Sequence, residues 1–177
     1  MTGGATLPRM AVPDHDDLGA LSPYVGEEHR STIAVLVAVL RTGRQLESWL
    51  STVLGVEELN SSEFSALISL LLAGPPHRRA AGELSAAVVQ TSGGTTKTVQ
   101  RLEQRGFVTR VADPDDGRRA LVELTLQGAQ QARTALALVL EAFDLEIGDL
   151  SEAGRDEVRV ALAQLSTELD QRLRPGG

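Results

Sequence analysis

The order of elements encoded in residues 92–128 constrains the fold more than any other feature of the chain. A polar, basic stretch with helical spacing comes first, and Gly106 is expected to end it. A short β-rich run, a turn made of Asp, Pro and Gly, and a second β-rich run follow directly. A helix followed by a two-stranded ribbon with a charged tip is typical of a winged helix-turn-helix, which reaches two grooves of DNA.

The predicted helix, which Thr91 or Ser92 can cap, has two different faces. Val99 and Leu102 are three residues apart and are expected to face the core. Another face carries polar and basic residues without any carboxylate, namely Gly93, Thr96, Lys97, Gln100, Arg101 and Gln104. An ordinary solvated face is the alternative, but the absence of Glu and the adjacent wing favour a DNA-reading surface.

The wing is predicted from two short strands, which include Val108 and Val111 on one side and 121–124 on the other. The turn between them contains Asp, Pro and Gly at 113–117, and Arg118 and Arg119 follow it. An arginine at a ribbon tip suits a narrow minor groove. Alternatively, an aspartate of the turn pairs with one arginine and stiffens the tip, and both interpretations can hold together.

Three sequence pieces in register resemble the MarR family of bacterial winged-helix transcriptional regulators. The pieces are 96–108, which contains the pattern Leu-Glu-x-x-Gly-hydrophobic-Val, then 113–118, which contains Asp-x-Arg, and 124–128, which reads Leu-Thr-x-x-Gly. The resemblance is sharp over residues 60–130. Gly117 departs from the family pattern, which often has a basic residue there, so either Arg118 or Arg119 is a candidate for the minor groove.

Charge is distributed unevenly along the 177 residues. Residues 77–119 carry eight Arg or Lys and five Asp or Glu, a net charge of +3, whereas the whole chain is −7 and the remainder is therefore −10. The only lysine, Lys97, lies on the proposed recognition face. This segregation favours one basic footprint on a chain that otherwise repels DNA.

Several classes of protein are excluded or made improbable by what the sequence lacks. The chain has no cysteine, and His15, His29 and His77 lie far apart, so we expect no disulfide and no metal site. We predict no cofactor and no enzymatic activity, because nucleophile-elbow, Walker and metal motifs are all missing. A signal peptide is not visible and the longest apolar run, 32–40, is too short for a bilayer, which predicts a cytoplasmic protein.

The fold class expected is mainly α with a small β-wing, a winged helix-turn-helix joined to a bundle of terminal dimerisation helices. Residues 1–22 are predicted to form a flexible N-terminal arm, and 23–177 one unit. Within that unit, 23–58 and 125–177 are the expected dimerisation helices and 60–124 the DNA-binding lobe. The lobe is expected to contain a helix from Asn60 or Ser61 to Ala73 and another from Ala80 to Val88.

The terminal helices are predicted to pair between two copies of the chain. The helix from Pro23 to Leu54 is apolar on several faces in its first half, and a helix of that kind needs cover on more than one side. Two further apolar seams are predicted, one in the helix 125–147 (Leu126, Ala129, Ala132, Leu136, Leu140, Phe143) and one in the last helix (Val158, Leu162, Leu165, Leu169, Leu173). The last seam also fits an intramolecular core, but the resemblance implies a twofold homodimer.

Roles in DNA binding follow from helical position. Lys97 and Gln100 are the candidates for base edges, and Thr95, Thr96 and Thr98 for mixed phosphate or base contacts. Arg101, Arg110 and the pair Arg78 and Arg79, expected at the entry of a helix, are candidates for phosphate contacts. The complete predicted set is Arg78, Arg79, Ser92, Gly93, Thr95, Thr96, Lys97, Thr98, Gln100, Arg101, Arg110, Arg118 and Arg119.

The resemblance also implies control by a small aromatic or carboxylated effector. Arg41, Arg44, Trp49 and Phe64 are the candidate ligand-binding residues, although Trp49 and Phe64 taken singly fit plain core positions better. The alternatives to a ligand-released repressor on a palindromic operator are a winged-helix adaptor for other proteins and a ligand-binding dimer without specific DNA binding.

Overall fold

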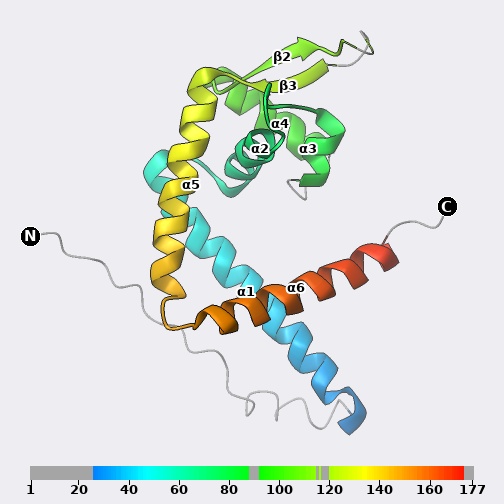
Figure 1. Ribbon diagram of the computed structural model, residues 1–177. Helices are drawn as coiled ribbons and strands as arrows, with labels where there is room; N and C mark the ends of the chain where they lie inside the picture. Colours follow the sequence, from blue (N-terminus) through cyan, green and yellow to red (C-terminus); the bar gives the residue numbers. More distant parts are fainter. Residues whose placement is uncertain (1–25, 88–91, 115, 117–119, 174–177) are drawn as a thin grey trace, which may run out of the picture. The chain divides into compact units, whose positions relative to one another are not determined.

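The computed structural model describes residues 26–87, 92–114, 116 and 120–173, and its contacts divide the chain into two units, Met1–Trp49 and Leu50–Gly177 (Figure 1). The two units are described separately below. The predicted N-terminal arm, residues 1–22, lies outside the described residues.

The described residues of the first unit form a 3-10 turn and most of the first long helix. The turn η2, Glu27–His29, leads into α1, Arg30–Leu54, so the helix predicted from Pro23 ends at Leu54 as expected but begins at Arg30. The apolar side chains of Val35, Leu36 and Leu40 are 54%, 51% and 52% exposed. Water therefore reaches much of the apolar surface that the sequence places on this helix.

The second unit begins with the end of α1 and contains a three-stranded antiparallel sheet with three short helices packed around it. Its elements include the 3-10 turn η3, Gly55–Glu57, and then α2 Ser61–Leu72, β1 Arg78–Ala80, α3 Ala81–Ala87, α4 Ser92–Gln104, β2 Val108–Ala112 and β3 Ala120–Leu124. The strand order is β1-β3-β2, and β2 pairs with β3 in the register Val108 opposite Leu124. The predicted winged helix-turn-helix is confirmed.

The core of this lobe is formed by aliphatic side chains that the helical and strand spacings turn inward. Val99 and Leu102 of α4 are buried, as predicted, together with Leu84 of α3. Val88, the last residue of the helix predicted from Ala80, lies outside the described residues. The remaining core side chains come from the end of α1, from α2, from the strands, from α5 and from two connecting segments: Leu54, Leu59, Ala66, Leu67, Leu70, Phe107, Val108, Val122, Leu124, Ala129, Ala132 and Ala135.

Two further helices complete the second unit, α5 Leu126–Glu146 and α6 Glu152–Leu173. α5 packs against α2 through its small side chains, which include Ala129, Ala132 and Ala135. The prediction that Leu126 belongs to this core face is wrong, because Leu126 is the first residue of the helix, lies outside the stripe of small side chains and is 93% exposed.

The last helix, α6, begins after Ser151, which caps it, because the Ser151 hydroxyl accepts a hydrogen bond from the Gly154 N–H. Its predicted apolar seam is about half exposed at Val158, Leu162 and Leu169. The described part of the chain therefore leaves this seam largely uncovered.

A tight joint connects the end of α4 to the start of α5 and explains two of the family-like sequence patterns. Gly106 has φ +74°, and Phe107 N–H donates to the carbonyl of Leu102, which together form the glycine-dependent helix ending predicted there. The Thr125 hydroxyl then donates to the Gly106 carbonyl and accepts from the Gly128 N–H. A Cβ on Gly128 would lie 1.8 Å from the Phe107 carbonyl oxygen, so only glycine fits.

Candidate nucleic-acid interface

The helix α4 presents a polar stripe to solvent and an apolar stripe to the core. Thr96, Lys97 and Gln100 are exposed, and so is Gly93, beside which a Cβ would meet nothing within 4 Å. Among the described residues, Lys97 and Gln100 have no hydrogen-bond or ion-pair partner. Their side chains are therefore available to a ligand outside the chain, as a base-reading role requires.

The structure corrects the prediction for two threonines of α4. Thr95 and Thr98 are only 2% and 1% exposed, and the Thr98 hydroxyl donates to the Gly94 carbonyl at 3.2 Å. A side chain buried to this extent has no surface to offer to a phosphate or a base, so neither threonine belongs to the interface. The signal was present in the sequence, because both lie three or four residues from the core residues Val99 and Leu102.

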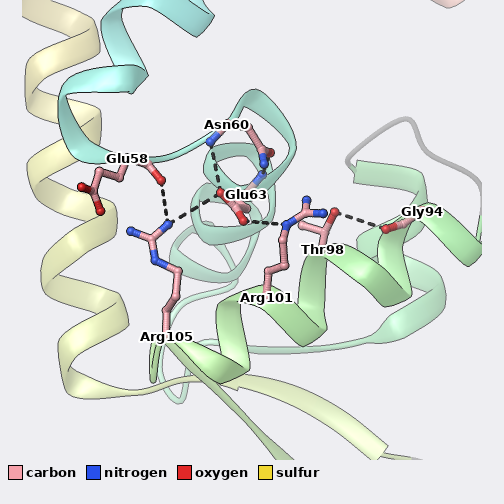
Figure 2. Close-up of polar contacts among 7 residues, drawn as sticks. All are labelled: Glu58, Asn60, Glu63, Gly94, Thr98, Arg101 and Arg105. Atoms are coloured by element: carbon pink, nitrogen blue, oxygen red, sulfur yellow. Dashed lines mark hydrogen bonds and ion pairs between the residues drawn. The ribbon is translucent and has the colours of Figure 1, made fainter.

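Arg101 and Arg105 lie on the side of α4 that faces α2, and both reach the same buried carboxylate (Figure 2). The Nε of Arg101 is 2.9 Å from Oε1 of Glu63, and Nη1 of Arg105 is 3.7 Å from Oε2. The Glu63 side chain is 5% exposed, whereas that of Arg101 is 47% exposed. Arg101 is therefore anchored at one end of its guanidinium group and accessible at the other.

Sequence reasoning missed Glu63 and Arg105 as parts of this arrangement. The spacing Asn60-x-x-Glu63 is that of a capping box, and the structure shows both of its hydrogen bonds, 2.9 Å and 3.1 Å long. The spacing indicates the start of α2, but it carries no information about arginines some forty residues later in the chain.

Arg110 lies on β2, on the other side of the exposed stripe. Its Nε is 3.3 Å from Oε2 of Glu103, and both side chains are 40% exposed. Ion pairs thus flank the exposed residues of α4 on both sides. An exposed pair of this kind contributes little to stability, but it limits the orientations that the Arg110 side chain samples.

Arg78 and Arg79 lie directly before α3, at the entry predicted for them, but in a strand that the sequence analysis did not predict. They belong to β1, where Arg78 lies opposite Glu123 of β3, with 3.9 Å between the charged groups. The Arg79 Nε donates to the carbonyl of Ser69 in α2 at 2.9 Å. Arg79 therefore holds β1 against α2, and its side chain is one-third exposed.

Three predicted DNA-binding positions are not described in full. Arg118 and Arg119, at the predicted wing tip, lie outside the described residues. Ser92 is the first residue of α4. The structure therefore places neither arginine relative to the rest of the lobe.

The sequence of this lobe matches a family model. Residues 58–119 match the MarR family, and the matched range contains α2, the helix-turn-helix and the first strand of the wing. The matched range covers about a third of the chain, so the similarity to the MarR family is a similarity of this lobe.

Solved structures of regulators share this MarR fold. A probable transcriptional regulator from Pseudomonas aeruginosa is 28% identical, over 72% of this chain and 93% of that chain, with a TM-score of 0.61. A MarR mutant from E. coli, complexed with operator DNA, is 20% identical over 79% and 99%, with a TM-score of 0.67. An organohalide-sensing regulator in its 2,4-dichlorophenol-bound form is 17% identical over 82% and 83%, with a TM-score of 0.67. No match was found among curated proteins.

The candidate effector residues of this chain are divided between the two units. Arg41, Arg44 and Trp49 lie on α1 in the first unit, where Arg44 is exposed and the other two are half-buried. Phe64 lies on α2 in the second unit and packs against the core of the lobe. Their joint role in one effector site remains a prediction.

Two other features bear on the sequence predictions. Within the described residues, no group of three or more His, Asp or Glu side chains lies close enough together to hold a metal ion. No helix in the same part of the chain is long and apolar enough to cross a membrane.

Proposed function

We propose that this chain is a MarR-family regulator, a cytoplasmic homodimer that binds a pseudo-palindromic operator as a repressor and is released from it by a small anionic or aromatic effector. The observation that carries the proposal is the exposed face of α4, which presents Lys97 and Gln100 to solvent. The opposite, buried face of the helix packs against the core and holds α4 in place. A helix of this kind inserts in the major groove and reads base edges.

The base contacts are assigned to Lys97 and Gln100, with Thr96 and Gly93 beside them. Lysine donates to the acceptors of guanine, and glutamine pairs in a bidentate manner with adenine. Ser92, at the start of the helix, is assigned to a phosphate. These residues span about two turns of α4, and the major groove is wide enough to admit an α-helix.

The phosphate contacts are assigned to arginines at both sides of α4. Arg101 and Arg110 are each anchored by a carboxylate and remain 47% and 40% exposed. Arg78, 36% exposed, and the one-third exposed Arg79 are assigned to the same role at β1. Arg118 or Arg119 is assigned to the minor groove. An anchored arginine loses less side-chain entropy when it binds a phosphate.

Dimerisation is supported by the apolar surface left exposed on α1 and α6. Val35, Leu36 and Leu40 of α1, and Leu162 of α6, each have more than half of their side-chain surface exposed. Burial of such surface against a second copy is favourable by about 25 cal/mol per Å². Two copies related by a twofold axis would place their α4 helices in successive major grooves, about 34 Å apart.

Effector release is proposed by analogy with relatives of the same fold. The organohalide-sensing regulator was solved with 2,4-dichlorophenol bound, and the E. coli MarR mutant with operator DNA. In this chain, Arg41 and Arg44 supply positive charge and Trp49 an aromatic surface, which suit an anionic aromatic molecule. Phe64 is the fourth residue of the proposed site.

In vitro selection of random DNA duplexes at moderate salt tests the proposal. We expect enrichment of an inverted repeat with half-site centres about one helical turn apart. Release of the selected duplex by phenols or aromatic carboxylates then tests effector control. No enrichment by a folded, dimeric preparation would contradict operator binding and would favour a protein-interaction adaptor.

A further inference from the structure

We propose that Glu63 is a positioning residue for operator recognition: its buried carboxylate fixes α4 against α2 in the orientation that reads bases. The inference rests on the proposed function, because it assigns a cause to the specificity of that same interface. It concerns a residue on α2 that does not lie on the exposed face of α4.

The two oxygens of the Glu63 carboxylate contact three residues, Asn60, Arg101 and Arg105. Oε1 accepts a hydrogen bond from Arg101 at 2.9 Å. Oε2 accepts from the Asn60 N–H at 3.1 Å and lies 3.7 Å from Nη1 of Arg105. Only 5% of the side chain is exposed, so these contacts replace the solvation of the buried charge. Figure 2 shows the carboxylate between the start of α2 and the two arginines of α4.

Arg101 lies in the last turn of α4 and Arg105 directly after its last residue, so the two contacts hold the end of the helix at points one turn apart. Arg105 also donates to the Glu58 carbonyl at 2.8 Å, and its guanidinium lies 4.8 Å from the centre of the Phe107 ring. A helix held at two points along one side resists rotation about its own axis. The apolar stripe of Val99 and Leu102 holds α4 to the core, but apolar contact is not directional. The ion pairs with Glu63 therefore fix the rotation of α4 about its own axis.

The shape of the Arg101 side chain allows it to contact a DNA phosphate while it is bound to Glu63. Its Nε faces Glu63, and the guanidinium group carries further N–H donors in a fixed fork. The side chain is 47% exposed, so those donors are accessible. Glu63 thus orients both α4 and Arg101, which is assigned to a phosphate. Lys97 and Gln100 lie on the same helix, so the orientation of α4 also determines theirs.

Glu63→Gln tests the proposal with little change in volume. Glutamine at this position still accepts the Asn60 N–H in a capping box, but it removes the charge that holds both arginines. Affinities for the selected operator and for a scrambled duplex are measured by fluorescence anisotropy at several salt concentrations. We expect the operator-to-scrambled affinity ratio to fall about tenfold, the factor that the loss of one charge-assisted hydrogen bond produces.

Two variants separate positioning from stability and from net charge. Asn60→Ala removes the cap of the same helix and leaves the Glu63–arginine contacts, so it should lower the melting temperature but preserve the affinity ratio. Glu141→Gln makes the same charge change at an exposed residue of α5, away from the arginines assigned to phosphates, so it should leave the affinity ratio unchanged.

A double-mutant cycle decides whether Glu63 acts through Arg101. Arg101→Lys keeps the positive charge but loses the planar fork that directs Nε to Glu63 and further N–H groups away from it. We expect the double variant Glu63→Gln, Arg101→Lys to lose no more specificity than either single variant. Additive losses, or an unchanged ratio in folded Glu63→Gln, would overturn the proposal. If the unmodified protein selects no operator, the proposed function fails instead.

Discussion

The contact between Gly128 and the Phe107 carbonyl is a constraint that a single methyl group would violate. A Cβ at 1.8 Å from a backbone oxygen forces the backbone of α5 away from the end of α4. We expect Gly128→Ala to lower the free energy of unfolding by about 3 kcal/mol, the upper part of the range for overpacked sites. Chemical denaturation followed by circular dichroism measures this change.

Gly82→Ala is the matched control for this prediction. Gly82 lies in α3, and a Cβ there would meet nothing within 4 Å. The same substitution should stabilise the lobe by up to about 1 kcal/mol, because alanine favours a helix. Equal effects of the two substitutions would show that the Phe107 contact does not explain the glycine of the Leu-Thr-x-x-Gly pattern.

A second prediction at the residue scale concerns Lys97. We expect Lys97→Ala to relax base preference at one position of each half-site, at a cost of about 1–3 kcal/mol on the preferred sequence. Repeated selection with the variant, compared with the unmodified protein, measures the change. A uniform loss on all sequences would instead make Lys97 a phosphate contact.

At the scale of elements, periodicity predicted most of the secondary structure and turn chemistry most of the boundaries. The helices up to Leu54 and from Ser61 were confirmed because their apolar spacings and the Asn60 cap are local signals. The strand β1 was missed because three residues, two of them arginine, show no alternation. Its existence depends on pairing with β3, over forty residues later.

The candidate site was predicted less completely, because burial and pairing are properties of the whole lobe. The exposed positions of Lys97 and Gln100 followed from helical spacing. The burial of Thr95 and Thr98 was not predicted. Their spacing from Val99 and Leu102 indicated core positions, but their hydroxyl groups led us to assign them to the polar surface. Glu63 lies 38 residues before Arg101, a separation over which spacing carries no signal.

The apolar seam of α6 allows a prediction about this element. Leu162 is 54% exposed, beside Val158 and Leu169 at helical spacing. We expect Leu162→Asp to shift the protein from dimer to monomer, because it places a charge where apolar surface would be buried. Sedimentation equilibrium measures the change, and Gln164→Asp, an exposed polar position on the same helix, should leave the dimer intact. A stable dimer of Leu162→Asp would exclude this seam from the interface.

At the scale of the whole molecule, the segregation of charge governs how binding responds to salt. The segment 77–119 is +3 within a chain of net charge −7, so attraction to DNA depends on a few cations. We expect affinity to fall steeply with salt, and Arg101→Ala to reduce the slope of log affinity against log salt by about one unit for each protomer. An unchanged slope would mean that Arg101 contacts no phosphate.

The joint at Gly106, Phe107, Thr125 and Gly128 has a mechanical consequence. Because hydrogen bonds and close packing lock the end of α4 to the start of α5, the two helices move together instead of bending at their junction. α5 has 21 residues and is therefore about 31 Å long, so a tilt of about 4° at one end displaces the other by about 2 Å. In the proposed dimer, α5 would act as a lever arm: a small rearrangement near its far end would change the distance between the two α4 helices that read the DNA.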